Sequence, residues 1–128
     1  MTIGRVLHTG ALSAFARGSL YMAALLRRAV DGDVVLAIPT GALAEAWASA
    51  GDGRYRLDLL MSLPVVTVVA MNESAARAVG ELLAATNQRD TVAGHTAYVS
   101  AEKGWPILTT DAKRVRAVNP AADIDEIP

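Results

Sequence analysis

The stretch that decides the fold is Trp105 to Asp111, which reads WPILTTD. Its apolar centre has the length and residue types of a short buried strand, and it follows a helical segment that Gly104 ends. In open α/β sheets, ligand crevices lie at the carboxyl ends of the strands. Asp111 directly follows this expected strand, so it is the best single candidate for a site residue.

Four more segments of the chain read as strands. Val34 to Ile38 and Val65 to Val69 are mostly apolar runs of strand length, and Ile3 to Leu7 suits a strand although it includes Arg5. In Ile124 to Ile127, acidic residues stand between the two isoleucines, as is plausible for an edge strand. Helical patterns separate these runs. This alternation predicts a three-layer α/β/α sandwich with a central, mostly parallel sheet. At 128 residues, the range 1–128 is expected to be one domain with one core.

Capping residues mark where several of the helices begin. Ser19 and Asn72 precede helical periodicity and are good N-caps, and Thr40 is expected to cap a third helix that carries Glu45. Tyr55 to Leu63 reads as a fourth helix. These positions place Glu45 in the helix that follows the second strand.

Composition excludes several classes of function. The net charge of −1 provides no global field for a polyanion, so any contact with nucleic acid needs a local patch. The chain has no cysteine, which excludes disulfides, zinc–thiolate sites and a thiol nucleophile, and which fits a cytoplasmic protein. The apolar run Leu20 to Leu26 is too short for a membrane span, so no membrane association is expected. There is no P-loop, no GxGxxG and no nucleophile elbow.

Carboxylates at the carboxyl ends of strands are the candidates for chemistry. Metal-dependent phosphodiester cleavage needs several carboxylates at one point, because Mg²⁺ and Mn²⁺ take oxygen ligands and must activate a water. Glu45 and Asp111 meet that condition, and His8 directly follows the first strand. Each also has a structural explanation: an exposed helix stripe for Glu45, a helix cap for Asp111, and a buried hydrogen-bonded side chain for His8.

Two further groups of residues have ordinary structural explanations. His95 lies on the inner part of a helix and is expected to be a hydrogen-bonded structural histidine. A set of basic residues can line a phosphate-binding groove if its members share a face, but exposed helix surfaces explain it equally well. The set consists of Arg17, Arg27, Arg28, Lys113, Arg114 and Arg116.

Several short motifs, taken in order, resemble PIN-domain proteins of the VapC toxin type, and the match covers essentially the whole chain. They are VLHTGAL at Val6–Leu12, Ile38-Pro39 with LAEAW at Leu43–Trp47, Gly94-His95, WPILTTD at Trp105–Asp111 and the closing Ile124–Pro128. The resemblance implies an Mg²⁺- or Mn²⁺-dependent ribonuclease, usually a homodimer, that is paired with an antitoxin and acts on RNA.

The resemblance also implies a quartet of acids, from which this chain departs twice. Glu45 and Asp111 match the second and fourth acids, but His8 stands at the first and Ala93 at the third. Asp90 lies one helical turn before Ala93 and is a partial substitute. The expected metal ligands are therefore Glu45, Asp111 and Asp90, and the expected catalytic residues are Glu45, Asp111 and His8.

Two functional hypotheses follow from these departures. The first is a PIN-like protein with a degenerate metal site, weak or inactive as a nuclease, that binds an antitoxin-like protein, RNA or a second copy. The alternative is an active ribonuclease that uses Glu45, Asp111 and His8 around Mn²⁺ or a softer cation. His8 and Ala93 remove two negative charges from the quartet, which favours the first hypothesis. A site of this kind is expected to hold Mg²⁺ or Mn²⁺ poorly or not at all. A receiver-like signalling domain is excluded, because the acidic pair near the first strand is missing.

Overall fold

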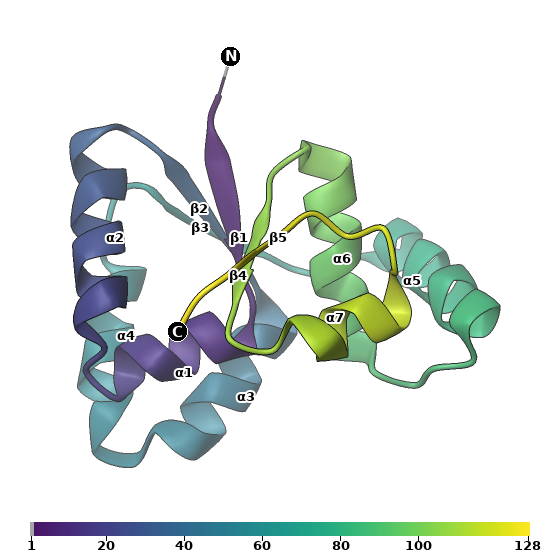
Figure 1. Ribbon diagram of the computed structural model, residues 1–128, viewed down its shortest axis with the longest axis horizontal. Helices are drawn as coiled ribbons and strands as arrows, with labels where there is room; N and C mark the ends of the chain where they lie inside the picture. The colour runs from purple at the N-terminus through teal and green to yellow at the C-terminus, as the bar shows by residue number, and fades with distance from the viewer. Residues whose placement is uncertain (1) are drawn as a thin grey trace.

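A parallel sheet forms the centre of the molecule (Figure 1). The computed structural model describes residues 2–128, and Met1, which the expected domain includes, lies outside the described residues. Within that part, five strands are ordered β3-β2-β1-β4-β5 and every pairing is parallel. The strands are β1 (Gly4–Leu7), β2 (Val35–Pro39), β3 (Val66–Val69), β4 (Ile107–Thr109) and β5 (Ile124–Glu126). The predicted α/β/α sandwich is confirmed.

Helices cover both faces of this sheet. They are α1 (Thr9–Ala16), α2 (Leu20–Asp31), α3 (Thr40–Ala50), α4 (Arg54–Met61), α5 (Glu73–Thr86), α6 (Thr91–Lys103) and α7 (Ala112–Val118). Figure 1 shows α1, α2 and α4 on one side of the sheet and α5, α6 and α7 on the other. Helix α3 contacts both α1 and α6. Within residues 2–128, no helix has both the length and the apolar character needed to cross a bilayer.

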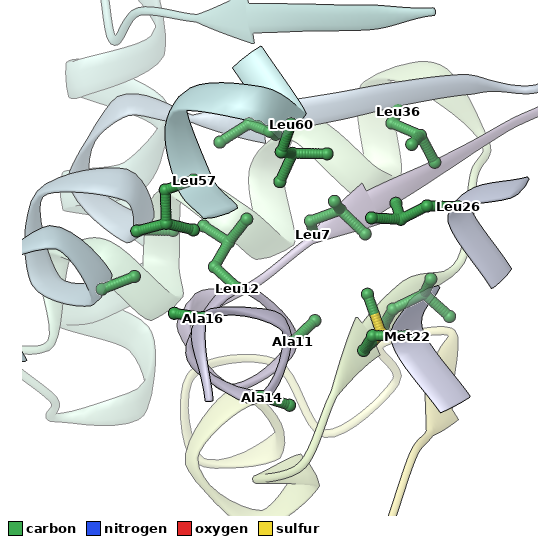
Figure 2. Packing of buried hydrophobic residues seen from close by; sticks show 14 of the residues in the cluster. Leu7, Ala11, Leu12, Ala14, Ala16, Met22, Leu26, Leu36, Leu57 and Leu60 are labelled. Carbon is green, nitrogen blue, oxygen red and sulfur yellow. The ribbon is translucent and has the colours of Figure 1, made fainter. Parts of the chain in front are cut away.

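The central strands are buried on both faces, which explains their continuous apolar sequences. Leu7 and Leu36 belong to the larger core cluster, together with residues of α1, α2 and α4, whereas the adjacent Val6 and Ala37 pack with Val99 of α6. Figure 2 shows the larger cluster around α1, including Leu12, Met22, Leu57 and Leu60. Packing on both faces fixes the register of the strands and therefore the positions of the residues that follow them.

The observed caps agree with the sequence at two of three positions. Ser19 Oγ accepts the Met22 N–H, and Asn72 Oδ1 accepts the Ala75 N–H. The expected cap at Thr40 is wrong, because Pro39 is the N-cap residue and Thr40 is already helical. The extended backbone of Pro39, with φ −62° and ψ 136°, makes the break between strand and helix without a side-chain cap.

The two edges of the sheet are β3 and β5. The prediction of an edge strand at the C-terminus is confirmed, with Asp125 and Glu126 exposed. The regular strand ends one residue earlier than expected, at Glu126. Ile127 is nevertheless buried, and its N–H donates to the Thr109 carbonyl at 2.9 Å. The end of the chain is thus held against β4, beside the candidate site.

Two glycines give opposite expectations for substitution by alanine. A Cβ at Gly53 would collide with the backbone carbonyl of Ala16, whereas a Cβ at Gly80 in α5 meets no atom within 4 Å. We expect Gly53→Ala to lower the free energy of unfolding by about 2 kcal/mol, because backbone must shift. Gly80→Ala should raise it by about 0.5 kcal/mol through a less flexible unfolded chain. Urea denaturation measures both, and a G53A midpoint at or above that of the wild type would contradict the packing.

Candidate functional site

Five polar side chains gather at the carboxyl edge of the sheet, and we name them the strand-end cluster. Its members are His8 after β1, Glu45 on α3, Asp90 before α6, Asp111 after β4 and Arg114 on α7. The carboxyl ends of parallel strands lie at one edge, so the topology brings together residues that are far apart in sequence. Every expected site residue, namely His8, Glu45, Asp90 and Asp111, belongs to this cluster, whereas Ala93, which stands where the family's third acid would be, does not.

Arg114 joins two of the carboxylates. Its Nη1 and Nη2 donate to the two carboxylate oxygens of Glu45 at 3.0 Å each, and its Nε and Nη2 donate to those of Asp90 at 2.6 and 2.8 Å. These are two bidentate, charge-assisted pairs on one guanidinium. Arg114 therefore links α3, α6 and α7, and its charge is already matched, which removes it from any phosphate-binding groove.

Local hydrogen bonds hold each carboxylate in place. Glu45 Oε1 also accepts the Thr9 hydroxyl at 2.7 Å. Asp90 is the N-cap of α6 and accepts the Ala93 N–H at 3.1 Å. Asp111 is the N-cap of α7 and accepts the Arg114 N–H at 3.1 Å, so the capping explanation for Asp111 is confirmed. That cap sets the first turn of α7, from which the side chain of Arg114 extends.

The ion pairs keep both acids charged. Burial opposes ionisation of Glu45, but hydrogen bonds from Arg114 and Thr9 and the Arg114 charge together hold its pKa below the usual value. Hydrogen bonding from Arg114 is the main reason that the pKa of Asp90 is lowered, against the opposing effect of burial. The same contacts raise the pKa of Arg114. Near neutral pH the three groups are therefore ionised.

His8 is fully buried beside these charges. Its Nδ1 lies 2.9 Å from Thr109 Oγ1, which also accepts the Asp111 N–H at 3.0 Å. Burial, aided by the Arg114 charge, lowers the His8 pKa to about 4, so the ring is neutral near pH 7. Nε2 has no hydrogen-bond partner within residues 2–128. The expectation of a buried, hydrogen-bonded histidine thus holds for Nδ1 alone.

The side chains of Ala93 and His95 are buried within the packing of α6, although the Ala93 N–H donates to Asp90. Ala93 is fully buried in an apolar cluster with Ala97 and Val118. His95 is 3% exposed, and its Nε2 lacks a partner in the part of the chain that the structure describes. His95 is buried as expected, but the expected hydrogen bond is not found for its Nε2 among the described residues. Nearly all of α6 from Ala93 to Ser100 is buried, so packing fixes this ring, and burial lowers its pKa.

As arranged, the strand-end cluster does not fit a divalent cation. Magnesium and manganese need several free carboxylate oxygens, but all four oxygens of Glu45 and Asp90 are bonded to Arg114. Asp111 adds one exposed carboxylate that caps a helix. Among residues 2–128, no group of three or more histidines and acids is placed to hold a metal ion. The roles of Glu45, Asp111, Asp90 and His8 in metal binding or catalysis stay predictions.

The sequence did not identify two residues that shape this site. Thr109 fixes the ring of His8, and Arg114 was grouped only with the surface basic residues. Arg114 comes three positions after a capping aspartate at a strand end, where its N–H meets that cap. This spacing from Asp111 was the one feature of the sequence that could have placed Arg114 at the site. Asp90 and Glu45 share the one guanidinium of Arg114.

Comparison with known proteins supports the fold. No family model matches the sequence, and no curated protein does. A chain in the crystal structure of VapBC2 from Rickettsia felis, bound to a DNA fragment from their promoter, is similar to this one. The TM-score is 0.67 at 14% identity, and the match covers 98% of this chain and 100% of that chain. The fold is PIN-like. At this identity the likeness concerns the fold alone, so the function of the PIN-like chain must be argued from its site.

Proposed function

We propose that residues 1–128 form one PIN-like domain that acts as a binding module related to toxin–antitoxin systems and is weak or inactive as a nuclease. The observation that carries this proposal is the guanidinium of Arg114 between Glu45 and Asp90. The chain itself supplies the positive charge that these acids need. The proposal also places the protein in the cytoplasm, in line with a sequence that has no cysteine.

The chemistry of RNA cleavage explains why this arrangement is unfavourable. A metal-dependent ribonuclease uses its cation to activate a water and to stabilise the charge on the phosphate. Here a cation would have to displace a guanidinium that makes four hydrogen bonds. The neutral ring of His8 and the methyl group of Ala93 supply no negative charge in its place. Little affinity for Mg²⁺ or Mn²⁺ remains, and without the ion no step of this mechanism is supported.

The proposed partners are an antitoxin-like protein and a second copy of the chain. The similar Rickettsia felis structure is of VapBC2 on promoter DNA, which makes an antitoxin-like protein the first partner to test. An apolar groove of about 280 Å³ between α1, α2 and α4 offers such a protein a surface. Leu59 at its rim is 60% exposed. Binding of RNA without cleavage belongs to the same proposal.

The test of the proposed function is RNA cleavage by the purified protein. With Mg²⁺ or Mn²⁺ present, we expect cleavage of a mixed RNA pool to stay at the level of the variants Glu45→Gln and Asp111→Asn. The physical reason is that the Arg114 guanidinium already occupies the carboxylate oxygens of Glu45 and Asp90 that a cation would need. Metal-dependent cleavage by the wild type that either substitution abolishes would refute the proposal and establish the alternative.

One observation favours that alternative, an active ribonuclease using Glu45, Asp111 and His8. His8 Nε2 is buried, without a partner in residues 2–128, and lies in the field of both acids. A neutral imidazole nitrogen of this kind is a ligand for Mn²⁺ or Zn²⁺. The alternative predicts that His8→Gln lowers metal-dependent cleavage, whereas the proposed function predicts that wild type and variant are equally inactive.

A further inference from the structure

We propose that the free edge of β3 is a dimer interface, at which a second copy of the chain adds its own β3 in antiparallel orientation and so doubles the five-stranded sheet. The inference rests on the proposed function, which includes a second copy as a partner, and deepens it by assigning the surface. Within residues 2–128, no strand lies beyond β3. The backbone groups of this edge are therefore open to a strand from another chain.

The sequence of β3 does not match its exposure in the single chain. Val65 to Val69 reads VVTVV, and a continuous run of β-branched residues is typical of a strand covered on both faces. In β2, such a run is buried from Leu36 to Pro39. In β3, however, Thr67 is exposed and Val68 is 45% exposed. The strand thus has the composition of an inner strand and the position of an outer one.

The two edges of the sheet differ in how they are protected. Soluble proteins usually shield an edge strand with charged residues, proline or a bulge. At β5, the exposed acids Asp125 and Glu126 provide such shielding. From Val65 to Met71, by contrast, the chain has no charged residue and no proline, and Met71 is 37% exposed. The unshielded edge is therefore the one at β3.

The sequence of β3 is self-complementary about Thr67. VVTVV reads the same in both directions, so a two-fold axis at Thr67 places Val66 opposite Val68 of the second copy. Contacts in an isologous dimer repeat in this way. Cross-strand pairs of β-branched side chains without like charges are favourable. This symmetry favours a second copy as the occupant over a partner of different sequence.

The backbone of β3 has the hydrogen-bonding pattern that this register needs. The Val65 carbonyl accepts the Leu36 N–H of β2 at 2.9 Å, and peptide groups alternate in direction along a strand, so those of Val66 and Val68 point away from β2. The Val66 N–H already donates to the Leu63 carbonyl at 3.1 Å. The Val68 N–H of each copy can therefore donate to the Val66 carbonyl of the other, which gives a symmetric pair of bonds.

The first test is the mass of the protein in solution, measured by analytical ultracentrifugation over a concentration series. We expect a reversible dimer with a Kd below roughly 100 µM. Val68→Lys should raise that Kd at least roughly tenfold, because the two-fold axis brings two added charges into one apolar interface. Leu20→Lys adds the same charge at an exposed position of α2 and should leave the Kd unchanged.

Cross-linking tests the register, because the chain has no cysteine of its own. Thr67 meets its counterpart in a non-hydrogen-bonded pair, whose Cα atoms lie about 4.5 Å apart, within the range for a disulfide. Oxidised Thr67→Cys should therefore form a covalent dimer. In the matched control Val68→Cys, the two cysteines are offset by two residues along the strands. Their Cα atoms then lie more than about 7 Å apart, too far for a bridge.

Four results would overturn the inference. They are a chain that is still monomeric at roughly 100 µM, a dimer that Val68→Lys does not weaken, equal cross-linking of Thr67→Cys and Val68→Cys, and a dimer that Leu59→Lys dissociates in place of Val68→Lys. The last result would move the contact to the apolar groove between α1, α2 and α4. The RNA cleavage assay decides the proposed function without reference to chain mass, so the two failures are distinguishable.

Discussion

Arg114→Met is expected to lower the free energy of unfolding by about 2 kcal/mol. Breaking a buried ion pair by removing one partner costs about 3–5 kcal/mol, and the partial exposure of these side chains reduces that figure. The loss arises because Glu45 and Asp90 are left without their shared donor. Urea denaturation at pH 7 measures the change.

Matched variants separate this ion pair from a general effect of charge. Arg116→Met should change stability by less than about 0.5 kcal/mol, because the residue is exposed. Arg114→Met with wild-type stability would show that the ion pairs contribute nothing to the fold.

Acidification from pH 6.5 to about 4 is expected to remove roughly 3 kcal/mol of stability through His8 alone. The pKa of the ring is about 4 in the folded protein and 6.5 in the unfolded chain. Between these values the unfolded chain binds the extra proton, so stability is fully present above pH 6.5 and falls as the pH is lowered. The charge of Arg114 adds to the effect of burial, while Asp90, Glu45 and Asp111 oppose it.

The variant His8→Gln isolates this contribution, because it does not titrate. The difference in unfolding free energy between wild type and variant should shift by roughly 3 kcal/mol between pH 7 and pH 4. Glu45 and Asp90 have lowered pKa values and lose their contribution at more acidic pH, so they do not obscure the comparison. Parallel pH profiles for the two proteins would show that His8 is not buried in its neutral form.

Much of the fold was predictable because its signals are local. Apolar runs such as Val34 to Ile38 are the mark of strands buried on both faces, and Ser19 and Asn72 cap their helices as their residue types predict. Placement of His8 and Asp111 at one edge of the sheet followed from the parallel topology. The error at Thr40 arose because the backbone of Pro39 alone ends the strand.

The electrostatics of the site were less predictable, because they depend on the direction of one long side chain. Arg114 contacts acids that lie 24 and 69 positions away in sequence. Its partners become apparent only once α3, α6 and α7 are packed together. The spacing of Asp90 and Ala93 did not predict that the Asp90 carboxylate reaches Arg114 of α7. The sequence therefore indicated Glu45 and Asp90 as site residues, and the structure identified the Arg114 guanidinium that lies between them.

The most direct test of this account is a crystal structure of the wild type soaked in Mn²⁺, with anomalous difference density measured at the carboxyl edge of the sheet. We expect continuous density for the Arg114 guanidinium between Glu45 and Asp90, and no anomalous peak beside them. An anomalous peak coordinated by Glu45 and Asp111, with Arg114 displaced, would contradict the account.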